Sequence, residues 1–296
     1  MKAKKIAAWM GLHTAVVFFI SVAANIVRAD VVYNDGQVNT FDGYEASGSA
    51  LVQDNPTPPP LTTTLVVVGG HLNYGGGSLN TYGSSQVTVS GGTVNYGYGS
   101  LNTYDTSQVI VSGGHLNYGG GSLNTYGSSQ VTVSGGTVNY GYGSLNTYDM
   151  SVVTVSGGAV SGCIYAYNSS TVKLSDGTVT GWLHGDIYAF NSSHVDIIPS
   201  GGGVSQLLYA YDTSTVTIHG YDFRTTGGLT LDGDKVLGMG ILNGRWFGPD
   251  DTMWTMTISQ NDAGATIRVV PEPATLSLLA LGGLAVLRRR RRRRMV

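Results

Sequence analysis

Apolar and polar residues alternate in short runs along most of the chain, and these runs return at a regular interval. In residues 100–121, SLNTYDTSQVIVSGGHLNYGGG, the β-favouring runs LNTY, QVIV and HLNY are separated by the turn compositions DTS, SGG and GGG. The alternation has period two, and no run is long enough for a helix. Each unit therefore predicts three short strands joined by Gly-rich corners.

The unit has a fixed length. Residues 71–105 are identical to residues 115–149, and successive Gly-Gly pairs lie 22 residues apart, ending at Gly70, Gly92, Gly114, Gly136 and Gly158. A constant period in this range is typical of stacked repeats. We expect an all-β parallel β-helix (β-solenoid) of about seven three-strand coils over residues 67–220.

Differences between coils predict which side chains point inward. In LNTY and its later copies IYAY, IYAF and LYAY, the first position stays aliphatic and the third stays small, which places both in the core. The QVIV run keeps two apolar positions, such as Val109 and Val111, and HLNY keeps one, such as Leu116. The second and fourth residues of LNTY then point outward.

Irregular caps are expected at both ends, because the open edges of an array otherwise recruit other strands. Residues 30–66, which contain QDNPTPPPLTTT, would form the N-terminal cap, and residues 221–269 the C-terminal cap. The side chains expected to cover the last coil are Trp246, Phe247, Met253, Trp254 and Met256.

The first 29 residues have the features of a secretory signal peptide. Three lysines precede the apolar stretch TAVVFFISVAA, and Val27-Arg28-Ala29 places small residues at −3 and −1 of a cleavage site near Asp30. An uncleaved anchor is the alternative. The lone Cys163 cannot form an intramolecular disulfide, so an exported chain would depend on packing and backbone pairing.

The charges are segregated along the chain. Seven of the 16 basic residues are the arginines of residues 288–294, whereas 17 of the 18 acidic residues lie between Asp30 and Asp262. The body is therefore strongly acidic, which argues against nucleic acid as a partner, because phosphate binding needs a basic surface.

The C-terminal segment predicts a short apolar helix. Residues 274–287 are apolar or small, and as a helix they would span roughly 21 Å, less than an ordinary bilayer core. The arginine run would keep its end on the cytoplasmic side. Together with the N-terminal signal, this places the acidic body outside the cytoplasm.

Pro271-Glu272-Pro273, followed by a short apolar segment and an arginine cluster, resembles the PEP-CTERM sorting signal in all three parts. The resemblance covers residues 270–296 and implies processing by an exosortase-type membrane peptidase, with at least transient membrane contact. It also implies a place in the cell envelope, on the surface or in the extracellular matrix of a Gram-negative-type bacterium that makes exopolysaccharide, a possible second partner. In addition, residues 67–220 resemble the solenoid repeats of such surface proteins and, more loosely, of autotransporter adhesins.

Two groups of titratable residues are candidates for chemistry. Asp105 and Asp149 follow the outward tyrosine in alternate coils, too far apart for an acid pair, so we interpret them as turn residues that bond their own backbone. The cluster His184, Asp186, His194 and Asp196 has metal-ligand residue types, but the register spreads it over different corners and faces. A surface ion pair between Asp196 and Lys173 is the simpler interpretation. We assign no catalytic, metal or cofactor site.

An outward aromatic ladder is the remaining candidate for a ligand-facing surface. It is flanked by Asn80, Asn102, Asn124 and Asn146, and a second column, Tyr74, Tyr96, Tyr118 and Tyr140, is expected beside a corner. Rings and amides suit sugar binding, yet like side chains also stack in any β ladder. The ladder consists of Tyr82, Tyr104, Tyr126, Tyr148, Tyr167, Phe190 and Tyr211.

From these patterns we expect a secreted, envelope-associated, non-enzymatic surface or extracellular-matrix protein. The alternatives are a glycan-binding adhesin and a carbohydrate-active β-helix enzyme, and an adhesin for another protein is a further possibility. An enzyme would need carboxylates clustered on one face.

Overall fold

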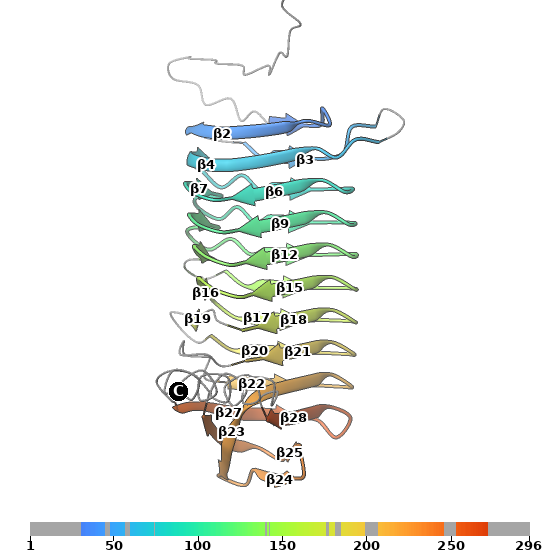
Figure 1. Ribbon diagram of the computed structural model, residues 1–296, viewed down its shortest axis with the longest axis vertical. Helices are drawn as coiled ribbons and strands as arrows, with labels where there is room; N and C mark the ends of the chain where they lie inside the picture. Colours follow the sequence, from blue (N-terminus) through green and yellow to red (C-terminus); the bar gives the residue numbers. More distant parts are fainter. Residues whose placement is uncertain are drawn as a thin grey trace, which may run out of the picture.

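The chain forms a stack of flattened β coils in a computed structural model (Figure 1). The structure describes residues 31–44, 48–56, 60–73, 75–139, 141, 143–175, 178–180, 185–198, 207–245 and 253–271. The predicted all-β solenoid of about seven turns is confirmed. The expected signal peptide, at residues 1–29, and the expected apolar helix, at residues 274–287, lie outside the described residues.

The first ladder is built from the LNTY runs and their equivalents. Its strands pair in parallel and in register, so that Leu123 lies between Leu101 and Leu145. Its strands are β1 (Val31–Tyr33), β3 (Ala50–Val52), β5 (Leu79–Thr81), β8 (Leu101–Thr103), β11 (Leu123–Thr125), β14 (Leu145–Thr147), β17 (Ile164–Ala166), β20 (Ile187–Ala189), β22 (Leu207–Ala210) and β27 (Met253–Asn261).

The second ladder is built from the QVTV runs, and a short third ladder follows it around each coil. The second contains β2 (Val38–Tyr44), β4 (Thr64–Leu72), β6 (Gln86–Val89), β9 (Gln108–Val111), β12 (Gln130–Val133), β15 (Val152–Val155), β18 (Thr171–Leu174), β21 (His194–Ile197), β23 (Thr215–Thr226) and β28 (Thr266–Pro271). The third contains β7 (Thr93–Val94), β10 (His115–Leu116), β13 (Thr137–Val138), β16 (Ala159–Ser161) and β19 (Thr178–Thr180), and begins at the end of β4.

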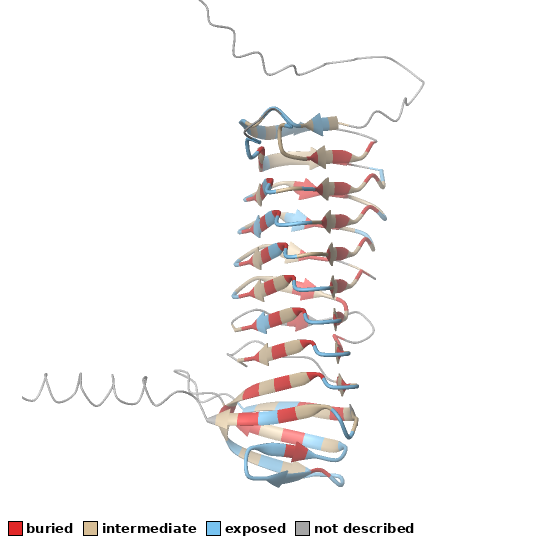
Figure 2. Ribbon diagram, turned by 90° about the vertical axis from the view of Figure 1, so that its right-hand side faces the viewer, coloured by how far each residue is buried: buried red, intermediate tan, exposed pale blue. Residues whose placement is uncertain are grey.

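The interior is the predicted column of aliphatic and small side chains. Leu101, Thr103, Val109, Val111 and Leu116 of one coil are all buried. The same alternation of buried and accessible residues recurs through the stack (Figure 2). This burial of β-branched and aliphatic side chains drives the coils together.

The N-terminal segment is more regular than expected. Residues 30–66 were predicted to be an irregular cap, but β1 and β3 continue the first ladder, with Val31 beside Ala50 and Ala50 beside Leu79. Strands β2 and β4 likewise continue the second ladder. ALV has the buried first and third residues of LNT, whereas VVY at the end of the stack is only half-buried. No Gly-Gly pair marks the corners of residues 30–66, so the sequence contained no sign of these strands.

The C-terminal cap combines one more coil with an antiparallel insertion. Strands β27 and β28 lie parallel to β22 and β23, whereas β24 (Thr230–Asp232), β25 (Lys235–Leu237) and β26 (Gly240–Arg245) pair in antiparallel fashion. Of the side chains expected to cover the last coil, Met256 is buried and Trp254 packs against the core. Met253 is 63% exposed, which contradicts the expectation, because it faces outward at the start of β27. Trp246 and Phe247 lie outside the described residues.

Candidate functional site: an outward aromatic ladder

The aromatic ladder lies on the outer face of the first ladder of strands. Each of its residues directly follows a strand such as LNT or IYA, so the alternation of the strand turns it away from the buried third residue. Its rings stack coil on coil with centroid distances of 4.6 to 5.0 Å and interplanar angles of at most 8°. The structure thus brings together Tyr82, Tyr104, Tyr126, Tyr148, Tyr167, Phe190 and Tyr211.

The stacked rings are parallel and offset sideways from one another. Parallel rings in contact have planes about 3.5 Å apart, so centroids separated by nearly 5 Å require a sideways offset. A ring inside the ladder, such as Tyr126, therefore has one ring against each face, Tyr104 on one side and Tyr148 on the other.

A neighbouring column on the same face changes chemistry along the stack. In four coils it is an amide ladder, in which Asn102 donates from Nδ2 to Asn80 Oδ1 at 2.8 Å, and Asn124 and Asn146 continue the chain. From Tyr165 onward the same position carries tyrosine, and Tyr165, Tyr188 and Tyr209 stack at 4.7 and 4.4 Å. Two aromatic columns therefore lie side by side over the later coils, with 6.1 to 6.3 Å between the ring centroids within each coil.

Burial in this doubled region raises tyrosine pKa values. Burial raises the pKa of Tyr165 to about 12, and the nearby Cys163, through its charge and a hydrogen bond, adds to the shift. Burial and the charge of Asp186 raise the pKa of Tyr188. These phenols therefore remain neutral hydrogen-bonding groups at physiological pH.

The second predicted aromatic column is partly described. Tyr96 and Tyr118 stack at 5.2 Å, and both are half-buried near a Gly-rich corner. Tyr74 and Tyr140, the other predicted members, lie outside the described residues.

The corner acids bond the neighbouring coil rather than their own turn. The prediction of a bond to the residue's own backbone was wrong: Asp149 Oδ2 accepts from the N–H of Gly127, one coil earlier, at 3.0 Å. Asp212 accepts from the N–H of Asn191 in the same way, also at 3.0 Å. Asp149 has φ 59°, a left-handed conformation that Asp and Asn tolerate well. These carboxylates clamp successive coils together.

The His/Asp cluster is not assembled as a metal site in the described part of the chain. Asp196 Oδ1 lies 2.7 Å from Nε2 of His219, a residue that the sequence reasoning missed. Lys173 is the Cα partner of Asp196, as the register predicted. Asp186 is buried elsewhere, near Tyr188, and His184 lies outside the described residues. Within the described ranges, no three His, Cys, Asp or Glu side chains converge on one point.

Two buried polar columns were also missed. Asn73, Asn95, Asn117 and Asn139 are buried at a corner, and each of the first three donates from Nδ2 to the next Asn Oδ1 at 2.7 to 2.9 Å. The serine three residues after each ring of the aromatic ladder is buried as well. One of them, Ser107, donates to the carbonyl of Tyr104 at 2.7 Å. The signal was present, because Asn precedes Tyr at each such corner and Ser is always third after the aromatic residue.

The family model for the PEP-CTERM protein-sorting motif matches residues 269–293. The motif indicates a protein that is exported and sorted by an exosortase to the cell envelope or surface of a Gram-negative bacterium. Its first residues belong to the folded body: Val269 is buried in β28, and Pro271 is the Cα partner of Gly220. Glu272 and Pro273 lie outside the described residues. None of the curated proteins or solved structures compared matches the chain. No helix in the described ranges is long and apolar enough to cross a membrane.

Proposed function

We propose that the protein is a non-enzymatic structural component of the cell surface or extracellular matrix. Its sorting motif begins within the last strand of the solenoid, so export would present the stack directly at the envelope. The observation that carries the non-enzymatic role is the use of the corner acids. Asp105 and Asp149 each accept a hydrogen bond from a backbone amide of the preceding coil, which is a structural role, and they lie two coils apart rather than as a pair of facing carboxylates.

An exosortase-type peptidase is the proposed processing partner, with Pro271, Glu272 and Pro273 as its recognition residues. The test is mass spectrometry of the mature C-terminus in an exosortase-containing host. A mature chain that lacks residues 288–294 is expected, and an intact arginine run would contradict processing. A Glu272→Ala variant should remain unprocessed, whereas Asp232→Ala, which removes an exposed acid of β24, should be processed normally.

Absence of catalysis is tested separately. The purified protein is incubated with plant, algal and bacterial polysaccharides, and new reducing ends or unsaturated sugars are measured. No product is expected. A product that disappears in Asp105→Asn or Asp149→Asn would establish the carbohydrate-active enzyme instead.

A glycan-binding adhesin is the second candidate, and the aromatic and amide ladders favour it over the enzyme. Matrix-deficient cells distinguish it from an adhesin for another protein. Loss of the protein from such cells supports a polysaccharide partner, whereas retention by them supports a protein partner.

A further inference from the structure

The aromatic ladder ends at Tyr82, and a hollow opens where the next ring would lie. Tyr82 follows Thr81, whose Cα partner is Val52, so the corresponding place in the preceding coil belongs to Gln53. The stacked neighbour of Tyr82 in the described residues is Tyr104, on the opposite side. Tyr82 is 37% exposed and ends the stack with one face uncovered by a ring.

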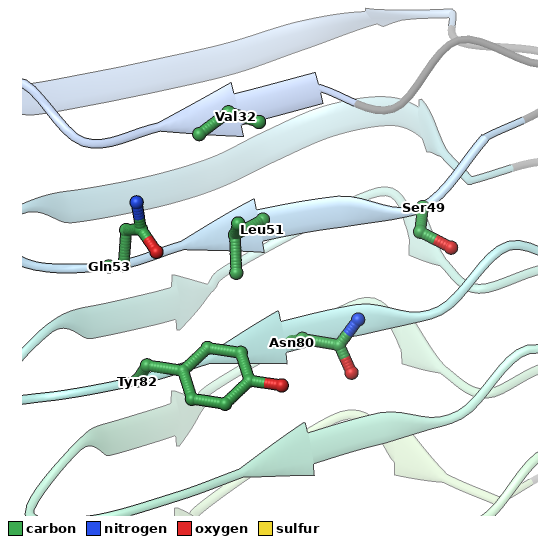
Figure 3. A pocket seen from close by; sticks show the side chains of 6 residues that line it. All are labelled: Val32, Ser49, Leu51, Gln53, Asn80 and Tyr82. Carbon is green, nitrogen blue, oxygen red and sulfur yellow. The ribbon is translucent and has the colours of Figure 1, made fainter.

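The hollow has a volume of about 450 Å³ and lies on the outer face of β1, β3 and β5 (Figure 3). Figure 3 shows the ring of Tyr82 along its lower side, with Gln53 and Leu51 above and Asn80 beside it. Short or flexible side chains stand here in place of the rings and amides of later coils. The lining residues are Val32, Ser49, Leu51, Gln53, Asn80 and Tyr82.

The amide ladder also ends in this hollow, and it ends on a donor. Asn102, Asn124 and Asn146 each donate from Nδ2 to the Asn Oδ1 of the preceding coil, and Asn80 Oδ1 accepts from Asn102 at 2.8 Å. The residue above Asn80 is Leu51, which has no acceptor in its side chain. The Nδ2 group of Asn80 therefore points into the hollow, as Figure 3 shows.

We propose that this hollow binds one sugar unit of a neutral polysaccharide. A pyranose ring has an apolar face that stacks on an exposed aromatic ring, and hydroxyl groups that pair with amides and hydroxyls. The hollow supplies the ring of Tyr82, the Nδ2 donor of Asn80 and the amide of Gln53. None of the six lining side chains is charged, and the acidic body disfavours anionic polymers, so the occupant is neutral.

The exact repeat provides a matched control. Tyr82 and Tyr126 lie in identical sequences, GSLNTYGSSQVTV, but Tyr126 has rings on both faces whereas Tyr82 has one. The probes are β-1,4-linked hexasaccharides of glucose, mannose and N-acetylglucosamine, with a galacturonate hexasaccharide as the anionic comparison. Affinity is measured by calorimetry and contact by saturation-transfer NMR on the full chain.

We expect Tyr82→Leu to weaken binding of a neutral probe about tenfold, which corresponds to about 1.4 kcal/mol, while Tyr126→Leu leaves it unchanged. A third variant, Gln53→Tyr, adds the missing ring and should abolish binding without lowering the melting temperature. Loss of binding in this variant cannot be explained by a failure to fold.

Three outcomes would overturn the proposal. The first is no binding of any neutral probe, and the second is equal weakening by Tyr82→Leu and Tyr126→Leu, which would place the ligand along the whole ladder. The third is a dimer that Tyr82→Leu dissociates, which would make the occupant an aromatic side chain of a second copy. The inference goes beyond the proposed structural role, whose own tests concern processing and product formation and are independent of these results.

Discussion

Asp105 Oδ2 accepts a hydrogen bond of 2.9 Å from the backbone N–H of Gly83, the residue that holds the same corner one coil earlier. Both residues have a left-handed backbone, with φ of 59° and 68°. The Asp105 side chain thus satisfies a backbone N–H of the preceding corner, so this residue both forms a turn and ties two coils together.

Two substitutions of Asp105 can distinguish the contribution of this hydrogen bond from the strain of the left-handed backbone. Asp105→Gly removes the hydrogen bond but keeps the left-handed conformation, so it should cost about 1 kcal/mol of unfolding free energy. Asp105→Ala also imposes a Cβ without a polar group on that conformation and should cost roughly 1 kcal/mol more. Thermal melting followed by circular dichroism measures both. An Ala variant as stable as the Gly variant would show that the strain argument is wrong.

A charge in the core column should be far more damaging. Val131 is 1% exposed and lies between Val109 and Val153, so Val131→Asp buries a carboxylate without a partner. We expect a loss of about 4 kcal/mol or more, with rapid proteolysis of the repeats. The control is Ile110→Asp in the adjacent coil, where the side chain is 43% exposed, and its melting temperature should change little.

The backbones of successive coils lie so close at Gly121 that even a methyl group should not fit there. A Cβ on Gly121 would overlap the carbonyl oxygen of Gly99 in the preceding coil. Gly121→Ala should therefore push two coils apart and lower the melting temperature by several degrees, because a shift of about 1–3 kcal/mol is typical of overpacking. In Gly43→Ala the added Cβ would lie 3.8 Å from the Phe41 ring, an ordinary contact. Equal stability of the two variants would contradict the predicted clash.

Alkaline pH should weaken the stack through its half-buried phenols. The pKa of Tyr165 is raised from 10.0 to about 12, so the folded state holds this proton more tightly than the unfolded state does. That contribution is complete below pH 10 and is lost as the pH rises towards 12. Melting temperatures measured from pH 9 to 12 should fall in this window, together with rising phenolate absorbance. Tyr165→Phe should show a shallower decline, and an identical decline would rule out this tyrosine as a cause.

The repeats could be predicted from the sequence because each strand pairs with a strand of the same apolar and polar pattern in the next coil. Substitution of Leu101 by Ile164 and of Thr103 by Ala166 in equivalent positions revealed the buried face, and the structure buries all four. The aromatic ladder followed from the same register. Strands β1 to β3 were hidden, because their corners vary in length and their sequences share little beyond apolar alternation.

Side-chain contacts between residues that are not register partners could not be predicted from the sequence. Asp196 was matched with Lys173 by register, but it bonds His219, which lies on the next strand and two residues beyond the partner of Asp196. The hollow beside Tyr82 was equally hidden, because Gln53 belongs to a segment in which no repeat was visible. The repeated aromatic positions are visible in the sequence, whereas the surface at the end of the aromatic ladder depends on the side chains that replace the next ring.

Because residues 71–105 recur unchanged at 115–149, loss or gain of one such 44-residue block would rejoin identical surfaces. Every interface between coils would be restored, and the protein would become shorter or longer by about 10 Å, the height of two strand spacings. Recombination between the two copies would thus adjust how far the molecule reaches from the bacterial surface without the need for any new contact to evolve.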